Sequence, residues 1–174
     1  SVEIDTYLAE TAAALTVEHP DYSYLAARIK VNSLHKETPG FIIATKNLYD
    51  DGLLREEYYK KVMENADLIE SVIDYDKDYT FDYFALTTLI RAYLLKFDNK
   101  TIERPQDLWM RVTLTVTGNE FDLDKIKETY KCLSSGMYTH ATPTLFNSGL
   151  KMQQLSPCFL IGMEDDSIEG IFNT

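Results

Sequence analysis

The residues between positions 139 and 161 decide how the rest of the chain is interpreted: Thr139-His140-Ala141-Thr142-Pro143-Thr144-Leu145-Phe146-Asn147-Ser148-Gly149, then Gln154-Leu155-Ser156-Pro157-Cys158-Phe159-Leu160-Ile161. The helical periodicity of positions 1–135 stops here. Pro143 fixes its own φ and disfavours the α region for Thr142, which predicts extended or turning backbone. Apolar residues flank Cys158 as in a buried strand bounded by a turn. A thiol on such a strand can act on a small polar ligand, or it can be core filling.

The composition is that of an acidic globular chain of one domain, or one and a fraction. Its 174 residues carry a net charge of −11 and are 45% hydrophobic, which is enough for a core. The negative charge argues against a nucleic-acid polymer as ligand, because such binding needs clustered Lys and Arg. No apolar run is long enough to cross a membrane, and no signal-peptide pattern opens the chain.

Neither the cysteines nor the carboxylates predict a metal site. Cys132 and Cys158 form no CxxC pair, which favours a reducing compartment and argues against structural zinc. The alternating Asp74, Asp76 and Asp78 lack the glycine and the glutamate that a calcium loop needs. We expect these aspartates to serve turns and helix caps, and Cys132 to be a small buried filler.

Apolar spacing predicts a mainly helical chain with one short hairpin. The expected helices cover residues 2–17, 22–36, 53–65, 66–75, 81–93, 105–116 and a last segment from Asp122 or Asp124 to Leu133. Residues 41–49 are apolar enough to pack and are expected to end in a turn at Asp50-Asp51-Gly52. The hairpin pairs residues 94–97 with residues 100–103 across Asp98-Asn99. Asp21 is expected to cap the second helix. The inner face of the first helix is expected to consist of Ile4, Leu8, Ala12 and Leu15.

Taken together, these segments resemble the large, catalytic subunit of ribonucleotide reductases. The family pattern is a hydroxyl-Pro-Thr segment, then Asn-x-Gly, then Gln-Leu-Ser-x-Cys-Phe-Leu, then Asp-Asp-Ser-Ile. The residues that match it are Thr142-Pro143-Thr144, Asn147-Ser148-Gly149, Gln154–Leu160 and Asp165–Ile168. The likeness continues upstream through His19–Tyr22, Leu25–Arg28, Leu34–Thr38, Tyr93–Lys96 and Glu103–Gln106. It covers nearly the whole chain and implies an early part of a much longer polypeptide.

The resemblance also implies a division of the chain. Residues 1–17 match the tail of an ATP-cone, residues 18–138 a helical N-terminal domain, and residues 139–174 the incomplete start of an α/β barrel. The expected fold class is therefore mainly α, leading into the first strand or strands of that barrel.

The chemistry that the resemblance implies centres on Cys158. In this family a thiyl radical takes a hydrogen from the sugar, and a pair of thiols supplies the reducing equivalents. Cys158 matches one of that pair, with its partner expected beyond position 174. Thr142, Pro157 and Cys158 match positions that contact the substrate nucleotide. Many members have serine where this chain has Pro157, so a hydroxyl and an N–H contact to the substrate phosphates is lost or moved.

Two further sets of residues match allosteric nucleotide contacts of the family. The specificity effector, a deoxynucleoside triphosphate, is expected at Asp166, Ser167 and Ile168. The activity effector, ATP or a deoxynucleotide, is expected at Ser1, Asp5 and Lys36. From the residues alone, Asp166 is a good cap for a helix over 167–172. From the residues alone, Ser1 is a helix cap, Asp5 is a first-turn carboxylate that favours the helix dipole, and Lys36 is a solvated lysine. We prefer this interpretation to effector binding because the rest of the cone is not present in this sequence.

The resemblance favours a class I ribonucleoside-diphosphate reductase in the cytoplasm, with no metal or cofactor bound in this segment. The radical would come from a separate metal-containing small subunit. Other expected partners are the remainder of the large subunit, a second large subunit, and thioredoxin or glutaredoxin as reductant. Two alternatives remain open: a non-catalytic acidic helical module for protein interaction, and an enzyme split so that a second polypeptide supplies the barrel.

Overall fold

The computed structural model describes residues 2–174 and confirms a mainly helical chain. Within that range the α-helices are α1 (Val2–Ala14), α2 (Asp21–Glu37), α3 (Phe41–Asp50), α4 (Glu56–Glu64), α5 (Ala66–Val72), α6 (Tyr83–Thr88), α7 (Pro105–Val116), α8 (Leu123–Ser134), α9 (Thr142–Asn147) and α10 (Ile168–Asn173). Two 3₁₀ helices and a π-helix lie between them, at Leu15–Val17, Tyr75–Thr80 and Leu89–Tyr93. A hairpin of β1 (Lys96–Phe97) and β2 (Lys100–Thr101) completes the elements.

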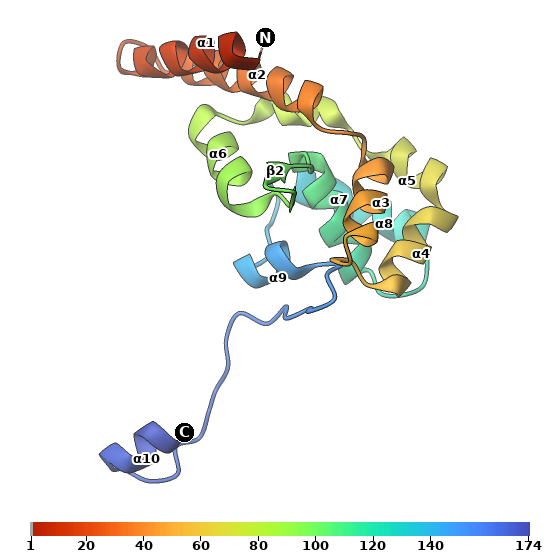
Figure 1. The fold of residues 1–174 in the computed structure, drawn as a ribbon, viewed down its shortest axis with the longest axis vertical. Helices are drawn as coiled ribbons and strands as arrows, with labels where there is room; N and C mark the ends of the chain where they lie inside the picture. The colour runs from red at the N-terminus through yellow and green to blue at the C-terminus, as the bar shows by residue number, and fades with distance from the viewer. Residues whose placement is uncertain (1) are drawn as a thin grey trace.

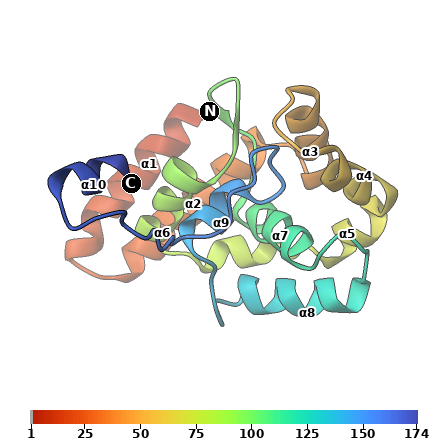
Figure 2. The same cartoon turned by 90° about the horizontal axis from the view of Figure 1, so that it is seen from below.

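Helix α7 lies at the centre of the fold, with α8 and α9 beside it (Figures 1 and 2). Ten of its twelve residues are buried. A helix buried on every side needs apolar residues on every side, or polar residues that find partners. Pro105 lies in its first turn, as predicted, where the missing N–H costs no hydrogen bond. The core cluster is assembled around Leu108, Met110 and Val112 of this helix.

The prediction for the inner face of α1 was wrong. Ile4 and Leu8 are 59% and 48% exposed, while Ala9 and Ala12 are buried. Figure 1 shows α1 running antiparallel to α2 along one end of the molecule. On α2 the buried residues at this level are also small, Ala26 and Ala27. Alanine brings the two backbones close together, and that contact excludes the larger side chains from the interface.

Three predicted helix starts differ in the structure, two of them because a β-bridge or a cap makes the helix begin later. Asp21 is the first residue of α2 rather than its cap. The helix expected from position 53 begins at Glu56, because Leu54 pairs with Leu150 in a β-bridge. The helix expected over 81–93 begins at Tyr83, where the side chain of Asp82 accepts a hydrogen bond from the N–H of Ala85, and it continues as the π-helix.

The hairpin and α8 follow the prediction closely. Asp98 and Asn99 have φ values of 48° and 60°, the left-handed conformations that a two-residue turn between strands requires. The strands are shorter than expected, with two residues each. The side chain of Asp122 accepts a hydrogen bond from the N–H of Lys125, so Asp122 is the cap of α8.

The segment from position 139 onward departs most from the prediction. Residues 142–147 form α9, because a proline in the first turn starts a helix as readily as it breaks one. Residues 155–161 form no strand, since a strand needs a neighbouring strand for its hydrogen bonds and none lies beside them. α10 begins at Ile168 with Ser167 as its cap, one residue later than expected. Figure 1 shows the chain after Leu150 running away from the helices to α10.

A buried polar network ties α2 to α7 and α8. The carboxylate of Asp78 accepts hydrogen bonds from Gln106 Nε2 at 3.1 Å and lies 2.7 Å from His35 Nε2. Gln106 Oε1 accepts from the hydroxyl of Tyr130 at 2.7 Å. Burial raises the pKa of Asp78, against the effect of its hydrogen bonds to His35 and Gln106. This carboxylate therefore holds three elements together, which is more than the turn and cap role that we expected for it.

A second buried carboxylate, Asp107, lies in α7. Its two oxygens accept hydrogen bonds from the hydroxyl of Tyr75 at 2.7 Å and from the N–H of Arg104 at 2.8 Å. Burial raises its pKa from the ordinary 3.8 to about 7, although both hydrogen bonds act to lower it.

We predict that Asp107 makes stability fall with rising pH. Because its pKa is higher in the folded chain, folding binds a proton between about pH 4 and pH 7, and the free energy of unfolding decreases across that window. Asp107→Asn keeps the shape but cannot ionise. In urea denaturation at several pH values, the wild type should lose stability relative to this variant from pH 4 to pH 7. Parallel stability curves would show that Asp107 titrates normally.

Candidate functional site

The site region is built on a buried ion pair between Arg111 in α7 and Glu103, which lies just before that helix. Arg111 and Glu103 are each about 2% exposed. Arg111 Nε donates to Glu103 Oε1 at 2.6 Å, and Nη2 donates to Oε2 at 3.1 Å. Arg111 Nη1 donates to the carbonyl oxygen of Ser148 at 2.8 Å. The guanidinium therefore fixes the turn that follows α9 while its charge is paired with that of Glu103.

The turn at Ser148-Gly149 favours glycine at position 149, because of its backbone conformation and its close packing. Gly149 has a φ of 77°, and a Cβ there would lie 3.3 Å from the ring of Tyr58. The backbone then pairs with the segment before α4: the N–H of Arg55 donates to the carbonyl of Gly149 at 3.0 Å. The N–H of Lys151 donates to the carbonyl of Leu53 at 2.9 Å. Residues far apart in sequence therefore anchor the start of the exposed segment.

Helix α9 is held from both sides. The hydroxyl of Ser148 donates to the carbonyl of Thr144 at 2.6 Å, and Leu145 is buried in the core. On the other side the ring of Phe146 lies 4.8 Å from the ring of Tyr93, in the π-helix. Two side chains of α9 bind the following chain: Thr144 Oγ1 donates to the carbonyl of Leu155, and Asn147 Nδ2 donates to the carbonyl of Gln154.

The predicted substrate residues are exposed and lie on either side of this anchored turn in the sequence. Thr142 opens α9, and its Oγ1 is 3.4 Å from the hydroxyl of Tyr93. Pro157 and Cys158 are exposed in irregular backbone. The thiol is therefore not the core filler that its residue type alone suggests. No hydrogen bond joins Thr142 to Cys158 within residues 2–174, although Thr142 opens α9 and the chain before Cys158 is bonded to that helix.

The predicted specificity-effector residues lie together at the start of α10. Ser167 caps the helix through a hydrogen bond from the N–H of Gly170 at 3.0 Å. Asp166 and Ile168 are exposed on either side of it. The backbone folds tightly here, because a Cβ on Gly170 would lie 2.5 Å from the carbonyl oxygen of Asp165. The three residues thus share one exposed turn, and no contact to the substrate residues fixes its position.

Two of the three predicted activity-effector residues meet. Lys36 Nζ donates to Asp5 Oδ2 at 3.1 Å and joins α2 to α1. The side chain of Lys36 is 66% exposed, so this ion pair is solvated and contributes little to stability. The third residue, Ser1, lies outside the described residues.

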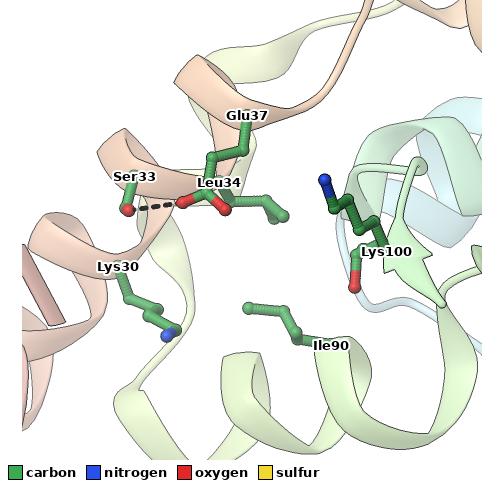
Figure 3. A pocket seen from close by; sticks show the side chains of 7 residues that line it. Lys30, Ser33, Leu34, Glu37, Ile90 and Lys100 are labelled. Atoms are coloured by element: carbon green, nitrogen blue, oxygen red, sulfur yellow. Dashed lines mark hydrogen bonds between the residues drawn. The ribbon is translucent and has the colours of Figure 1, made fainter. Parts of the chain in front are cut away.

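A hollow of about 240 Å³ lies next to this end of α2. Figure 3 shows Leu34 and Ile90 pointing toward each other across it, with Lys30 and Lys100 at its sides. Glu37 accepts a hydrogen bond from Ser33 in its wall, so a carboxylate offsets part of the lysine charge. None of the predicted site residues lines this hollow.

The described residues contain no cluster of three or more His, Cys, Asp or Glu side chains that could hold a metal ion. Among them no helix has the length and apolar character to cross a membrane. His140 packs edge-on against Tyr138 at 5.3 Å, and Asp74 of the rejected calcium loop caps the 3₁₀ helix through the N–H of Asp76.

Sequence reasoning missed Arg111, Glu103 and Tyr58. A signal for the first was present, because Arg111 lies between Met110 and Val112 in a helix with few exposed positions. An arginine in such a helix needs a buried acid, and the acid eight positions earlier meets that need. Tyr58 gave no signal, since its contact with the glycine turn exists only in the folded chain.

Comparisons with known proteins agree with the motifs. A family model described as "Ribonucleotide reductase, all-alpha domain" matches residues 79–153. Over its full length, the chain is 44% identical to a ribonucleoside-diphosphate reductase large chain of Schizosaccharomyces pombe and covers 22% of it. It is 45% identical to large chain 2 of Saccharomyces cerevisiae, covering 21%, and 45% identical to a large subunit of Danio rerio, covering 23%. The chain thus spans about a fifth of the length of these curated relatives.

We predict that Arg111→Met lowers the free energy of unfolding by about 3–5 kcal/mol, because it leaves the carboxylate of Glu103 buried without its charge partner. The double variant Arg111→Met/Glu103→Leu should recover much of that loss. Lys60→Met breaks the exposed Glu56–Lys60 pair of 2.6 Å and serves as the control, with almost no effect. Urea denaturation measures all three. A loss for Arg111→Met no larger than the control's would contradict the role of the buried pair.

We predict that Tyr58→Phe raises the free energy of unfolding, whereas Arg111→Met lowers it. The hydroxyl of Tyr58 is buried and has no hydrogen-bond partner within residues 2–174, and burial raises its pKa. Removing it should raise the free energy of unfolding by about 1 kcal/mol. The matched control is Tyr130→Phe, which loses bonds to Gln106 and to the N–H of Asp74 and should be destabilised. Thermal denaturation of both variants measures the two effects. An equal loss of stability in Tyr58→Phe and Tyr130→Phe would contradict the prediction.

Proposed function

The chain belongs to the ribonucleotide reductase large-subunit family, and on that premise we propose that it is part of a ribonucleoside-diphosphate reductase that makes DNA precursors. The observation that carries the proposal is the thiol of Cys158. It is exposed just after a segment that two side chains of α9 hold by hydrogen bonds. A structural cysteine would be buried.

In the proposed reaction, Cys158 is one thiol of a reducing pair. The 2′-hydroxyl of the ribose leaves as water, and a hydrogen replaces it on the carbon. The two thiols supply two electrons and two protons and close to a disulfide, so each turnover converts one dithiol into one disulfide. A thioredoxin or glutaredoxin would then reduce that disulfide, which suits a reducing compartment such as the cytoplasm.

The second thiol, the radical cysteine and the carboxylate base of this chemistry must come from other parts of the enzyme. A metal-containing small subunit would supply the radical. The exposed apolar side chains around Cys158 support this division: Phe159, Leu160 and Ile161 are 65–102% exposed. Side chains of this kind are expected against the remaining barrel and a second large subunit rather than against water.

For the nucleotide we propose that Thr142 and the backbone near Pro157 contact the substrate. Thr142 offers an exposed hydroxyl at the first turn of α9. Pro157 offers neither a hydroxyl nor an N–H, so a phosphate contact must be made by neighbouring groups. We further propose that the turn at Asp166, Ser167 and Ile168 contacts the specificity effector. Asp5 and Lys36 would contact the activity effector once the rest of the cone is present.

The alternative function is a non-catalytic module for protein interaction. The observation that favours it is the same run of exposed apolar residues, which any partner protein could cover. The two functions differ in what they require of Cys158, because an interaction surface does not need a reactive sulfur.

We predict that Cys158→Ser abolishes deoxynucleotide formation, because serine cannot form the disulfide that supplies the electrons. The assay uses the full-length large subunit with its small subunit and reductant, and measures conversion of a ribonucleoside diphosphate. The control is Cys132→Ser in α8, where the cysteine is partly buried and lies outside the proposed site; it should retain activity. Wild-type activity of Cys158→Ser would favour the interaction module.

A further inference from the structure

We infer that Thr144 and Asn147 are positioning residues for Cys158: together they hold the backbone that leads to the thiol at a fixed place on α9. The inference rests on the proposed function, because it concerns how that thiol is presented to a nucleotide. Neither residue needs to touch the substrate. They act through the carbonyl groups of Gln154 and Leu155.

The geometry of the two bonds is specific. Asn147 Nδ2 donates to the carbonyl of Gln154 at 2.7 Å, and Thr144 Oγ1 donates to the carbonyl of Leu155 at 3.0 Å. Residues three apart lie on one face of a helix, so both donors point the same way. In a regular strand, successive carbonyls point to opposite sides. Holding two neighbouring carbonyls on one side bends the chain, and the bend fixes the direction in which residues 156–158 leave.

The base of this clamp, formed by Thr144 and Asn147, is rigid. The carbonyl of Thr144 accepts a hydrogen bond from Ser148 Oγ at 2.6 Å, and the carbonyl of Ser148 accepts from Arg111 at 2.8 Å. Arg111 is held in turn by Glu103. A continuous series of short hydrogen bonds therefore runs from the buried ion pair of α7 to the segment that carries the thiol.

The link between clamp and thiol is short and stiff. Cys158 lies three residues beyond Leu155, a distance that chain geometry limits to about 10 Å. Pro157 lies inside this link. A proline fixes its own φ and restricts the residue before it to extended conformations, so Ser156 and Pro157 have little freedom. The proline therefore has a structural role. In place of the hydroxyl contact that a serine would make, its restricted backbone fixes the position of the Cys158 sulfur relative to Thr144 and Asn147.

The clamp has little value as a source of stability. Its outer bond, from Asn147 to Gln154, is exposed to solvent, where a hydrogen bond to water replaces it at little cost. A second amide makes a similar bond elsewhere: Asn65 Nδ2 donates to the carbonyl of Lys61 at 2.9 Å, at the end of α4. Asn65 offers a matched control, because its bond lies far from α9 in sequence and holds no part of the site.

The test compares Asn147→Ala, Asn147→Asp and Asn65→Ala in the full-length large subunit, assayed with its small subunit and reductant. We expect both Asn147 variants to lower kcat about tenfold. Aspartate keeps the size of asparagine but cannot donate a hydrogen bond. The KM for the ribonucleotide should change less than twofold, because Thr142 is held by α9 itself. The unfolding temperatures of the three variants should agree within about 2 °C. Asn65→Ala should keep the wild-type kcat.

A second measurement separates chemistry from reductant exchange. Pre-reduced enzyme without external reductant completes a turnover with its own thiols, and the rate of that first turnover should fall with kcat in the Asn147 variants. Thr144→Val, which keeps the shape and removes the donor, should show the same loss. Wild-type kcat in Asn147→Ala and Thr144→Val would overturn the clamp, and so would a kcat loss fully matched by Asn65→Ala. If Cys158→Ser is active, the proposed function fails; if it is inactive while Asn147→Ala is normal, only the clamp fails.

Discussion

The structure depends on a buried arginine. Arg111 brings a full charge into the most buried helix of the chain, and a charge in that position must be paired and hydrogen-bonded or it destabilises the fold. Glu103 satisfies two of its donors, and the carbonyl of Ser148 satisfies a third. Because all three groups must meet, the hairpin end, α7 and the turn after α9 are placed relative to one another in one arrangement. The start of the functional segment is thus set by an electrostatic requirement of the core.

A second arginine fixes the start of α7 to α2. Arg104 precedes the helix and donates to the carbonyl of Thr38 at 2.8 Å and to that of His35 at 3.2 Å, so it holds the end of α2. Asp78 holds His35 from another side. Lys36, which we propose as an effector contact, therefore belongs to a helix end that is fixed to α7. A single buried helix holds the proposed effector end and the proposed substrate end of this chain.

The proposed functional groups lie in an exposed part of the molecule. Cys158, Pro157 and Asp166 are exposed, and the apolar residues between them face solvent. Such an arrangement is costly for a finished surface, since several large apolar side chains contact water. It is consistent with a site that other strands and a second subunit complete. The helical part of the chain then serves as a platform that fixes where this segment begins.

The sequence alone determined most of the helical segments, where the hairpin turns, and which family the chain belongs to. Those properties depend on local signals: apolar spacing for α7 and α8, the side chain of Asp122 for a cap, and Asp98-Asn99 for a tight turn. Tertiary structure decided what local signals cannot contain. It chose Ala9 and Ala12 over larger residues for the α1–α2 interface, because a close approach of backbones requires small side chains. It turned Pro143 into the start of a helix and left residues 155–161 without a strand, because a strand forms only where another one lies beside it.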